Sequence, residues 1–193
     1  MNFEVIILFY ISKGIVFKPS AKSQVYVLRC GKDYELRDEQ AKFWLAGRFQ
    51  VAFNEDEKQQ TQLWKLEEMG LIEMAEPDET AKYRLLTNCV ICPVSPVNST
   101  FLLNKNEKVI WTWVRNTGLK LTISELVYLS EQQIKPDPSF FGEDNWHVLI
   151  HAIYNQETIF DRILDARMEE SEAMDSVVTA VLGLLRKKQI ILV

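Results

Sequence analysis

The chain has 193 residues and a formal net charge of −5, with 47% hydrophobic and 25% charged residues. This length and composition are typical of a folded protein with one large or two small domains, and they exclude a wholly disordered chain. The acidic balance disfavours a strongly basic nucleic-acid-binding protein but leaves room for a local basic patch.

The N-terminal segment predicts a buried strand. Its apolar run from Val5 to Ile11 is rich in aromatic and β-branched residues. The run is too short to span a bilayer and lacks the basic flank and cleavage site of a signal peptide. Three cysteines suit a reducing compartment better than a disulfide scaffold. We therefore expect a cytoplasmic protein without a membrane segment.

Two distant pairs of stretches suggest an internal duplication. Val25–Leu45 and Ile110–Ser130 each read as alternating apolar residues, a turn, a short strand and a helix. Further along, Leu63–Met74 aligns with Leu182–Val193, Leu63 lying over Leu182. The pattern predicts one unit over residues 1–95 and a second over 96–193, which carries a Pro-rich insertion.

A helix-to-strand transition carries the resemblance to a known class. The segment "LEEMGLIE" (Leu66–Glu73) and its weaker match "LLRKKQII" (Leu184–Ile191) resemble those of winged-helix transcription regulators. A hairpin ahead of the helices also resembles the small peptide-clasp domains that recognise leader peptides of modified natural products. The expected fold is α+β: two tandem winged-helix-like units, each a β-hairpin followed by a helical bundle. In the first unit, the polar turn Glu76–Thr80 is expected to join two strands of a wing.

The candidate recognition helices are acidic where a DNA-reading helix approaches phosphates. The first, Asn54–Met69, opens with Glu55, Asp56 and Glu57, which suit the helix dipole but repel phosphate. The second, Glu169–Lys188, is acidic at its start and basic only at its end. The side chains left as a candidate nucleic-acid or partner surface are Lys58, Gln59, Gln62, Lys65, Lys82, Arg84, Arg186, Lys187 and Lys188.

Two pairs of residues have metal-ligand or redox spacing. Cys89 and Cys92 form a CxxC pair, but the prolines that follow predict a strand and no second pair completes a zinc site. His147 and His151 lie four residues apart on a predicted helix, which is not an HExxH motif. We expect both pairs to be structural and no metal or cofactor to be bound.

The function expected from these patterns is binding. The sequence contains no nucleotide-binding glycine motif, no P-loop and no nucleophile elbow, so a non-enzymatic protein is expected. The first hypothesis is an adaptor that binds a protein or peptide partner, in one version by adding a strand to the exposed hairpin edge. The alternative is a winged-helix DNA-binding transcription regulator, in which a homodimer would pool the sparse basic residues.

Hydrophobic periodicity predicts six helices and two strands that the structure can test. The helices are expected near Asp38–Ala46, Glu55–Met69, Ile123–Gln132, Asp144–Tyr154, Thr158–Arg167 and Ser171–Lys188, and the strands over Val25–Leu28 and Leu71–Met74. Trp64, Leu66, Leu129 and Leu185 are expected to be buried.

Overall fold

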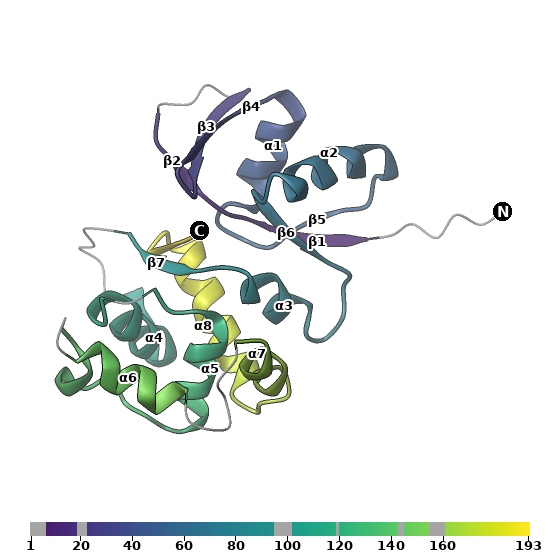
Figure 1. Ribbon diagram of the computed structural model, residues 1–193. Helices are drawn as coiled ribbons and strands as arrows, with labels where there is room; N and C mark the ends of the chain where they lie inside the picture. Colours follow the sequence, from purple (N-terminus) through teal and green to yellow (C-terminus); the bar gives the residue numbers. More distant parts are fainter. Residues whose placement is uncertain (1–6, 19–22, 95–101, 119, 143–144, 155–160) are drawn as a thin grey trace.

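The computed structural model describes residues 7–18, 23–94, 102–118, 120–142, 145–154 and 161–193 (Figure 1). The fold is α+β. The strands are β1 (Leu8–Ser12), β2 (Ile15–Val16), β3 (Gln24–Arg29), β4 (Lys32–Arg37), β5 (Ala52–Asn54), β6 (Ile72–Ala75), β7 (Ile91–Pro93) and β8 (Ile190–Leu192). The helices are α1 (Asp38–Gly47), α2 (Glu57–Glu68), α3 (Ala81–Thr87), α4 (Lys105–Asn116), α5 (Ile123–Glu131), the 3-10 helix η2 (Pro138–Phe140), α6 (Trp146–Ile153), α7 (Asp161–Glu169) and α8 (Met174–Arg186).

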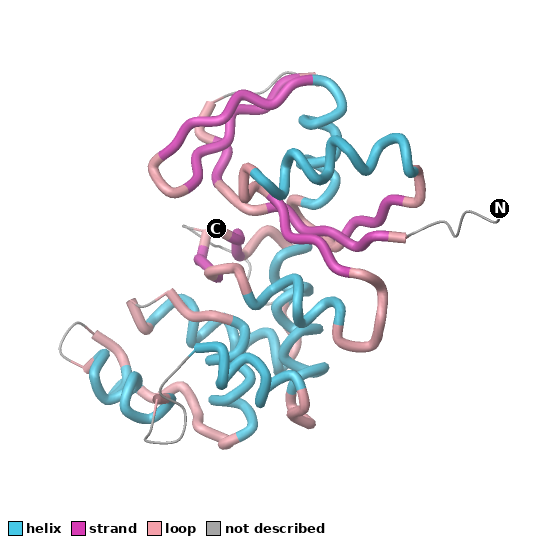
Figure 2. Tube along the Cα trace, turned by 45° about the vertical axis from the view of Figure 1, so that its right-hand side comes forward, coloured by secondary structure: helices cyan, strands magenta, loops and turns pink. Residues whose placement is uncertain are grey.

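The strands form three small antiparallel sheets. Their strand orders are β5-β1-β6, β2-β3-β4 and β7-β8. The first two lie in the upper part of the molecule with α1 and α2, whereas the remaining helices gather below them (Figures 1 and 2). Within the described ranges, no helix is long and apolar enough to cross a membrane.

Strand β1 lies between two hydrophobic clusters. The side chain of Tyr10 belongs to the cluster of the N-terminal part, with Trp44 and Leu66. The next side chain, Ile11, belongs to the larger cluster of α3 and the C-terminal helices. Because successive side chains of a strand point to opposite faces, one strand contributes to both cores.

The segment that follows β1 fastens the two parts together. The Ser12 hydroxyl donates to the Trp44 carbonyl at 2.7 Å, and the Trp44 indole donates to the Lys13 carbonyl at 3.1 Å. The amide of Gly14 donates to the carbonyl of Leu192 in β8 at 2.8 Å. The Lys13 ammonium is buried and forms an ion pair with Glu73 of β6. Strands from both ends of the chain therefore meet at Ser12–Gly14.

Most of the predicted helices are confirmed. Five of them begin and end within three residues of the predicted bounds: α1, α2, α5, α6 and α8. Helix α7 is confirmed over its described part, and Thr158–Phe160 lies outside the described residues. Leu66, Leu129 and Leu185 are buried as predicted. The prediction for Trp64 is wrong, because 52% of it is exposed. Helix α2 buries Leu63 and Leu66, and the neighbouring position of Trp64 points to another side of the helix.

The predicted wing is wrong in its second strand, which is helix α3. The segment Ala81–Leu85 alternates apolar and polar residues and therefore imitates a strand. However, Asp78 accepts hydrogen bonds from the Thr80 amide and hydroxyl just ahead of the helix, and Leu86 continues the buried face. The turn that Asp78 and Thr80 form ahead of α3, together with the burial of Ala81, Tyr83, Leu85 and Leu86, outweighs the two-residue period.

The predicted hairpin of the second unit is also wrong. Residues 110–114 lie in helix α4, which begins with a complete capping box between Asn104 and Glu107. That spacing of an amide and a carboxylate is a helix start signal that the alternation of apolar residues masked. A second complete capping box, between Thr122 and Glu125, lies at the start of α5. The tandem winged-helix duplication is therefore not confirmed, and the division at residue 95 stays a prediction.

One supersecondary unit does recur. Helix α2 ends with Gly70 at φ +70°, and the Leu71 amide donates to the Leu66 carbonyl at 2.8 Å. Helix α8 ends with Lys188 at φ +58°, and the Gln189 amide donates to the Leu184 carbonyl at 2.9 Å. Both ends are Schellman motifs, each followed by a strand. The structural correspondence pairs Leu66 with Leu184, as in the match of Leu66–Glu73 with Leu184–Ile191 and one residue away from the alignment of Leu63 with Leu182.

Gly14 provides a test of the junction between the two parts. At φ +113°, an added Cβ would lie 2.5 Å from Cγ1 of buried Val27 and 3.2 Å from the Leu28 carbonyl. We expect Gly14→Ala to lower the free energy of unfolding by about 3 kcal/mol or more, through backbone strain and overpacking. Chemical denaturation of the purified chain measures this.

Gly31 is the matched control because it also has a positive φ, +74°, but an added Cβ would meet nothing within 4 Å. Gly31→Ala should cost only about 1 kcal/mol. Equal losses for the two variants would contradict the tight junction at Gly14.

Candidate functional site

The predicted surface residues of α2 offer little free reading surface. Gln59 and Gln62 are half-buried, whereas Lys65 is exposed. Lys58 lies in the first turn of α2, but its side chain is outside the described residues. The neighbouring Gln60 is buried, so the start of this helix packs inward.

Lys82 and Arg84, predicted to share one strand, separate on helix α3. The Arg84 guanidinium donates to Asp78 at 2.5 Å and to Glu169 of α7 at 3.4 Å. The hydrogen bond between Arg84 and Asp78 lowers the pKa of the Asp78 carboxyl and raises the pKa of the Arg84 guanidinium. Arg84 is therefore engaged by acids of this chain. Lys82 is exposed and lines a different hollow.

The basic trio at the end of α8 also divides. The Lys187 ammonium donates to both carboxylate oxygens of Glu107, at 2.8 and 2.6 Å, and to the Leu102 carbonyl at 2.9 Å. Arg186 instead lines the hollow that Lys82 reaches. The Lys188 ammonium lies 5.3 Å from the centroid of the Phe49 ring. The structure thus brings Lys82, Arg186 and Lys188 to one region and removes Arg84 and Lys187 from it.

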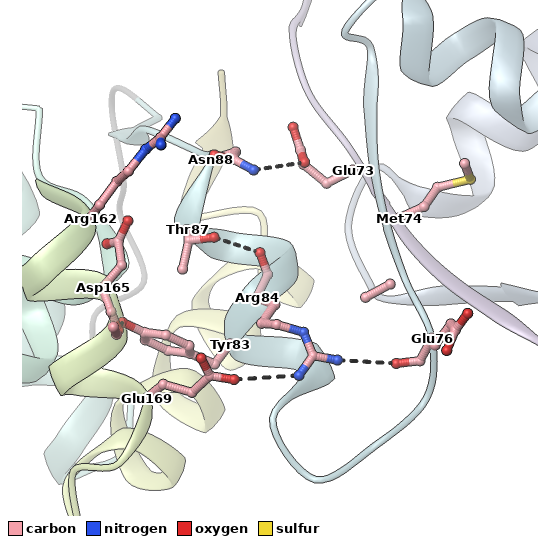
Figure 3. Close-up of a pocket in the computed structure, with 12 residues that line it drawn as sticks. Glu73, Met74, Glu76, Tyr83, Arg84, Thr87, Asn88, Arg162, Asp165 and Glu169 are labelled. Carbon is pink, nitrogen blue, oxygen red and sulfur yellow. Dashed lines mark hydrogen bonds and ion pairs between the residues drawn. The ribbon is translucent and has the colours of Figure 1, made fainter.

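A larger hollow of about 560 Å³ lies between β6, α3 and α7 (Figure 3). We call it the acidic hollow, since its lining carries four carboxylates and two guanidinium groups. These are Glu73, Glu76, Asp165, Glu169, Arg84 and Arg162. Figure 3 shows Arg84 reaching between the carbonyl of Glu76 and the carboxylate of Glu169.

Three of the six charged groups of the acidic hollow, Glu73, Arg84 and Glu169, form ion pairs with other residues of the chain. Glu73 pairs with Lys13 and accepts from Asn88 at 3.2 Å, and Asp165 accepts a short hydrogen bond from Ser124. Burial raises the pKa of Tyr83 to about 12, so its hydroxyl stays protonated and donates to the Asp165 carbonyl at 2.9 Å. This network holds α3 against α7.

Strand β4 has a free hydrogen-bonding edge. It pairs with β3 through Val25–Leu36 and Val27–Tyr34, and the ladder continues where the Asp38 amide donates to the Ser23 carbonyl at 2.8 Å. Antiparallel pairing alternates, so the amides of Tyr34 and Leu36 point to β3. Those of Asp33, Glu35 and Arg37 point away from the sheet. In the part of the chain that the structure describes, none of these three amides has a hydrogen-bond acceptor.

The cysteine and histidine pairs do not form a reactive or metal-binding cluster in the described residues. Burial raises the pKa of Cys89 to about 12 and also raises that of Cys92, which disfavours the thiolates that redox or metal chemistry needs. Cys89 donates to the Leu85 carbonyl at 3.2 Å, and His147 and His151 are exposed on α6. No group of three metal-ligating side chains occurs among the residues described.

Comparisons with protein-family models, with curated proteins and with solved structures found no match for this chain.

Of two features that the structure places on the surface, sequence reasoning predicted one in outline and missed the other. The first is the free edge of the hairpin, which was expected; that β4 is the strand at this edge depends on partners that a local pattern does not reveal. The other is the loop Arg48–Val51, which follows α1 and lies beside Lys82 and Arg186. A cation next to an aromatic residue in "RFQ" was its only sequence signal.

The ion pair of Lys187 has a measurable consequence for stability. Burial alone would raise the pKa of Glu107, but the hydrogen bonds from Lys187 outweigh it and the pKa is lowered. The pKa of Glu107 is therefore lower in the folded state than in the unfolded state, where it is about 4.5, and the ionised carboxylate stabilises the fold at pH values above about 4.5. This contribution disappears as the pH falls through the folded-state pKa. We expect Glu107→Gln to cost about 1–2 kcal/mol at pH 7 and progressively less below pH of about 4.

Denaturant titrations between neutral and acid pH measure this difference. Glu131→Gln is the control, because Glu131 is exposed on α5 and makes no ion pair with another described residue. A cost for Glu107→Gln that stays constant down to acid pH would contradict the assigned pair.

Proposed function

We propose that the chain is a non-enzymatic adaptor that binds an extended segment of a protein or peptide partner by strand addition to β4. The observation that carries the proposal is the row of outward amides at Asp33, Glu35 and Arg37. An added strand would satisfy these groups and gain one main-chain hydrogen bond for each. The exposed side chains of the same three residues would then face the partner's side chains.

The charges along β4 indicate the chemistry of the partner. Glu35 is paired with Arg37 at 2.7 Å and accepts a hydrogen bond from Gln24, whereas Asp33 makes no ion pair with a described residue. A partner strand with a lysine or arginine opposite Asp33 would complete the charge pattern. The same charges discourage pairing between two copies of β4, because charged side chains protect natural sheet edges against unspecific association.

Several further expectations belong to this proposal. The buried thiol of Cys89 and the pairing of Arg84 with Glu169 and of Glu73 with Lys13 support a binding role rather than catalysis. The three free cysteines suit a reducing cytoplasm. The recurring helix–strand units α2–β6 and α8–β8 support a kinship with winged-helix proteins, and a homodimer is compatible with this kinship.

A DNA-binding transcription regulator is the second candidate. The proximity of Lys82, Arg186 and Lys188 favours it. The engagement of Arg84 and Lys187 by acids of this chain counts against it, as do Glu55 and Asp56 ahead of α2. A sequence-specific complex at nanomolar protein in a gel-shift titration would favour the regulator over the adaptor.

Strand addition can be tested with a backbone substitution. Peptides selected from a random-sequence display library on the wild-type chain provide the probe. We expect Glu35→Pro to weaken their binding at least about tenfold in fluorescence anisotropy, because proline removes one outward amide. The substitution leaves the β3–β4 ladder intact, and the preceding Tyr34 is already extended.

Glu35→Ala is the matched control, since it removes the same side chain and the same ion pair with Arg37 but keeps the amide. It should bind within about threefold of the wild type. Unfolding curves of both variants confirm that each is folded. Equal affinities for the proline and alanine variants would reject strand addition at β4.

A further inference from the structure

A second, smaller hollow lies where the loop after α1 meets α3 and α8. Its volume is about 230 Å³, and its lining residues are Gln50, Val51, Lys82, Leu182 and Arg186. We call it the basic hollow. Beside it, the Phe49 ring carries two further cations: the Arg48 guanidinium at 4.6 Å and the Lys188 ammonium at 5.3 Å from its centroid.

The four cations of this region, Arg48, Lys82, Arg186 and Lys188, are not engaged in ion pairs in the part of the chain that the structure describes. Arg186 is within electrostatic reach of Glu107, but the oxygens of that carboxylate are held by Lys187 and the Asn104 amide. In a chain with 27 acidic and 22 basic side chains, this concentration of unpaired positive charge is unexpected.

Capping of α8 does not explain these cations. The last carbonyls of α8 already accept hydrogen bonds from backbone amides: Gly183 from Lys187, Leu185 from Lys188, and Leu184 from Gln189. Lys188 itself stands at φ +58°, the position that Gly70 occupies at the end of α2. A lysine there is strained where glycine is not, so its side chain is retained at a cost in stability.

We propose that the basic hollow binds the phosphate group of a small phosphorylated ligand, with Lys82 and Arg186 as its direct contacts. Arg48 and Lys188 add positive potential from the side of Phe49, and the Gln50 side chain offers a further donor. This site is independent of strand addition at β4. A hollow of this volume admits a phosphate with part of the group that carries it.

The surroundings favour a compact anion over a nucleic acid. Along the exposed face of α8, the positive charge of Arg186 gives way to Thr179 and then to Asp175. The residues that precede α3, and so Lys82, in the chain are Asp78 and Glu79. A nucleic acid needs a continuous track of cations that neutralises several phosphates, and neither α8 nor the start of α3 continues such a track from the basic hollow.

Isothermal titration of the purified full chain at low salt and pH 7 tests the proposal, with inorganic phosphate and pyrophosphate as probes. We expect one saturable pyrophosphate site per chain. The double variant Lys82→Gln, Arg186→Gln should weaken it at least about tenfold, through loss of two charged donors. Both side chains are exposed and make no hydrogen bond to other described residues, so the variant should fold normally.

The matched control is Lys108→Gln, Arg115→Gln, which removes one exposed lysine and one exposed arginine from α4. It should change the pyrophosphate affinity less than about twofold, because these charges lie outside the basic hollow. A second variant, Lys188→Gly, should keep or raise the unfolding midpoint while it lowers the affinity.

Three results would overturn the proposal. The first is the absence of saturable pyrophosphate binding to the wild type. The second is an equal loss of affinity in the two double variants, which would indicate a general charge effect. The third is tighter binding of a short single-stranded or duplex oligonucleotide than of pyrophosphate, abolished by Lys82→Gln, Arg186→Gln, which would assign the hollow to nucleic acid.

Discussion

The buried ion pair between Lys13 and Glu73 is the constraint on which the arrangement of this molecule depends. Only 3% of the Lys13 side chain is exposed, so its ammonium requires a nearby carboxylate. Glu73 lies in β6, which pairs with β1 and precedes α3. Removing either partner would leave an uncompensated charge between the two hydrophobic clusters. The pair therefore fixes where the C-terminal helices begin relative to the N-terminal sheets.

The two candidate surfaces follow from this junction. Strand β2 begins at Ile15, directly after Gly14. The β2-β3-β4 sheet therefore begins next to the hydrogen bond between Ser12 and the Trp44 carbonyl. Strand β4 is the last of that sheet and has no partner on its outer side among the described residues. The loop Arg48–Val51, which follows α1, packs against the hydrophobic cluster of α3 and the C-terminal helices through Phe49 and Val51. This contact places the loop beside Lys82 and Arg186.

The sequence predicted what depends on strong helical periodicity and little of what depends on distant partners. Helix α8 was predictable because its buried residues recur at helical spacing over 13 residues. The seven-residue helix α3 was not, since its alternation fits a strand and its burial comes from elements distant in sequence, among them β1, α5 and α8. Lys82 and Arg186 were predicted as surface cations, and the structure brings them together. Arg84 and Lys187 looked equivalent to them, but Lys187 is paired with Glu107, which is remote in sequence, and Arg84 with the nearby Asp78 and the remote Glu169.

The central claim is that β4 is an open sheet edge to which a partner strand adds. Residue-resolved hydrogen exchange measured by NMR tests this claim most directly. In the free protein, the amides of Asp33, Glu35 and Arg37 should exchange rapidly, while those of Tyr34 and Leu36 should be protected by β3. A bound extended peptide should slow exchange at Asp33, Glu35 and Arg37 and leave the other two unchanged. Protection of these three amides in the free protein, or no added protection in a saturated peptide complex, would contradict the account.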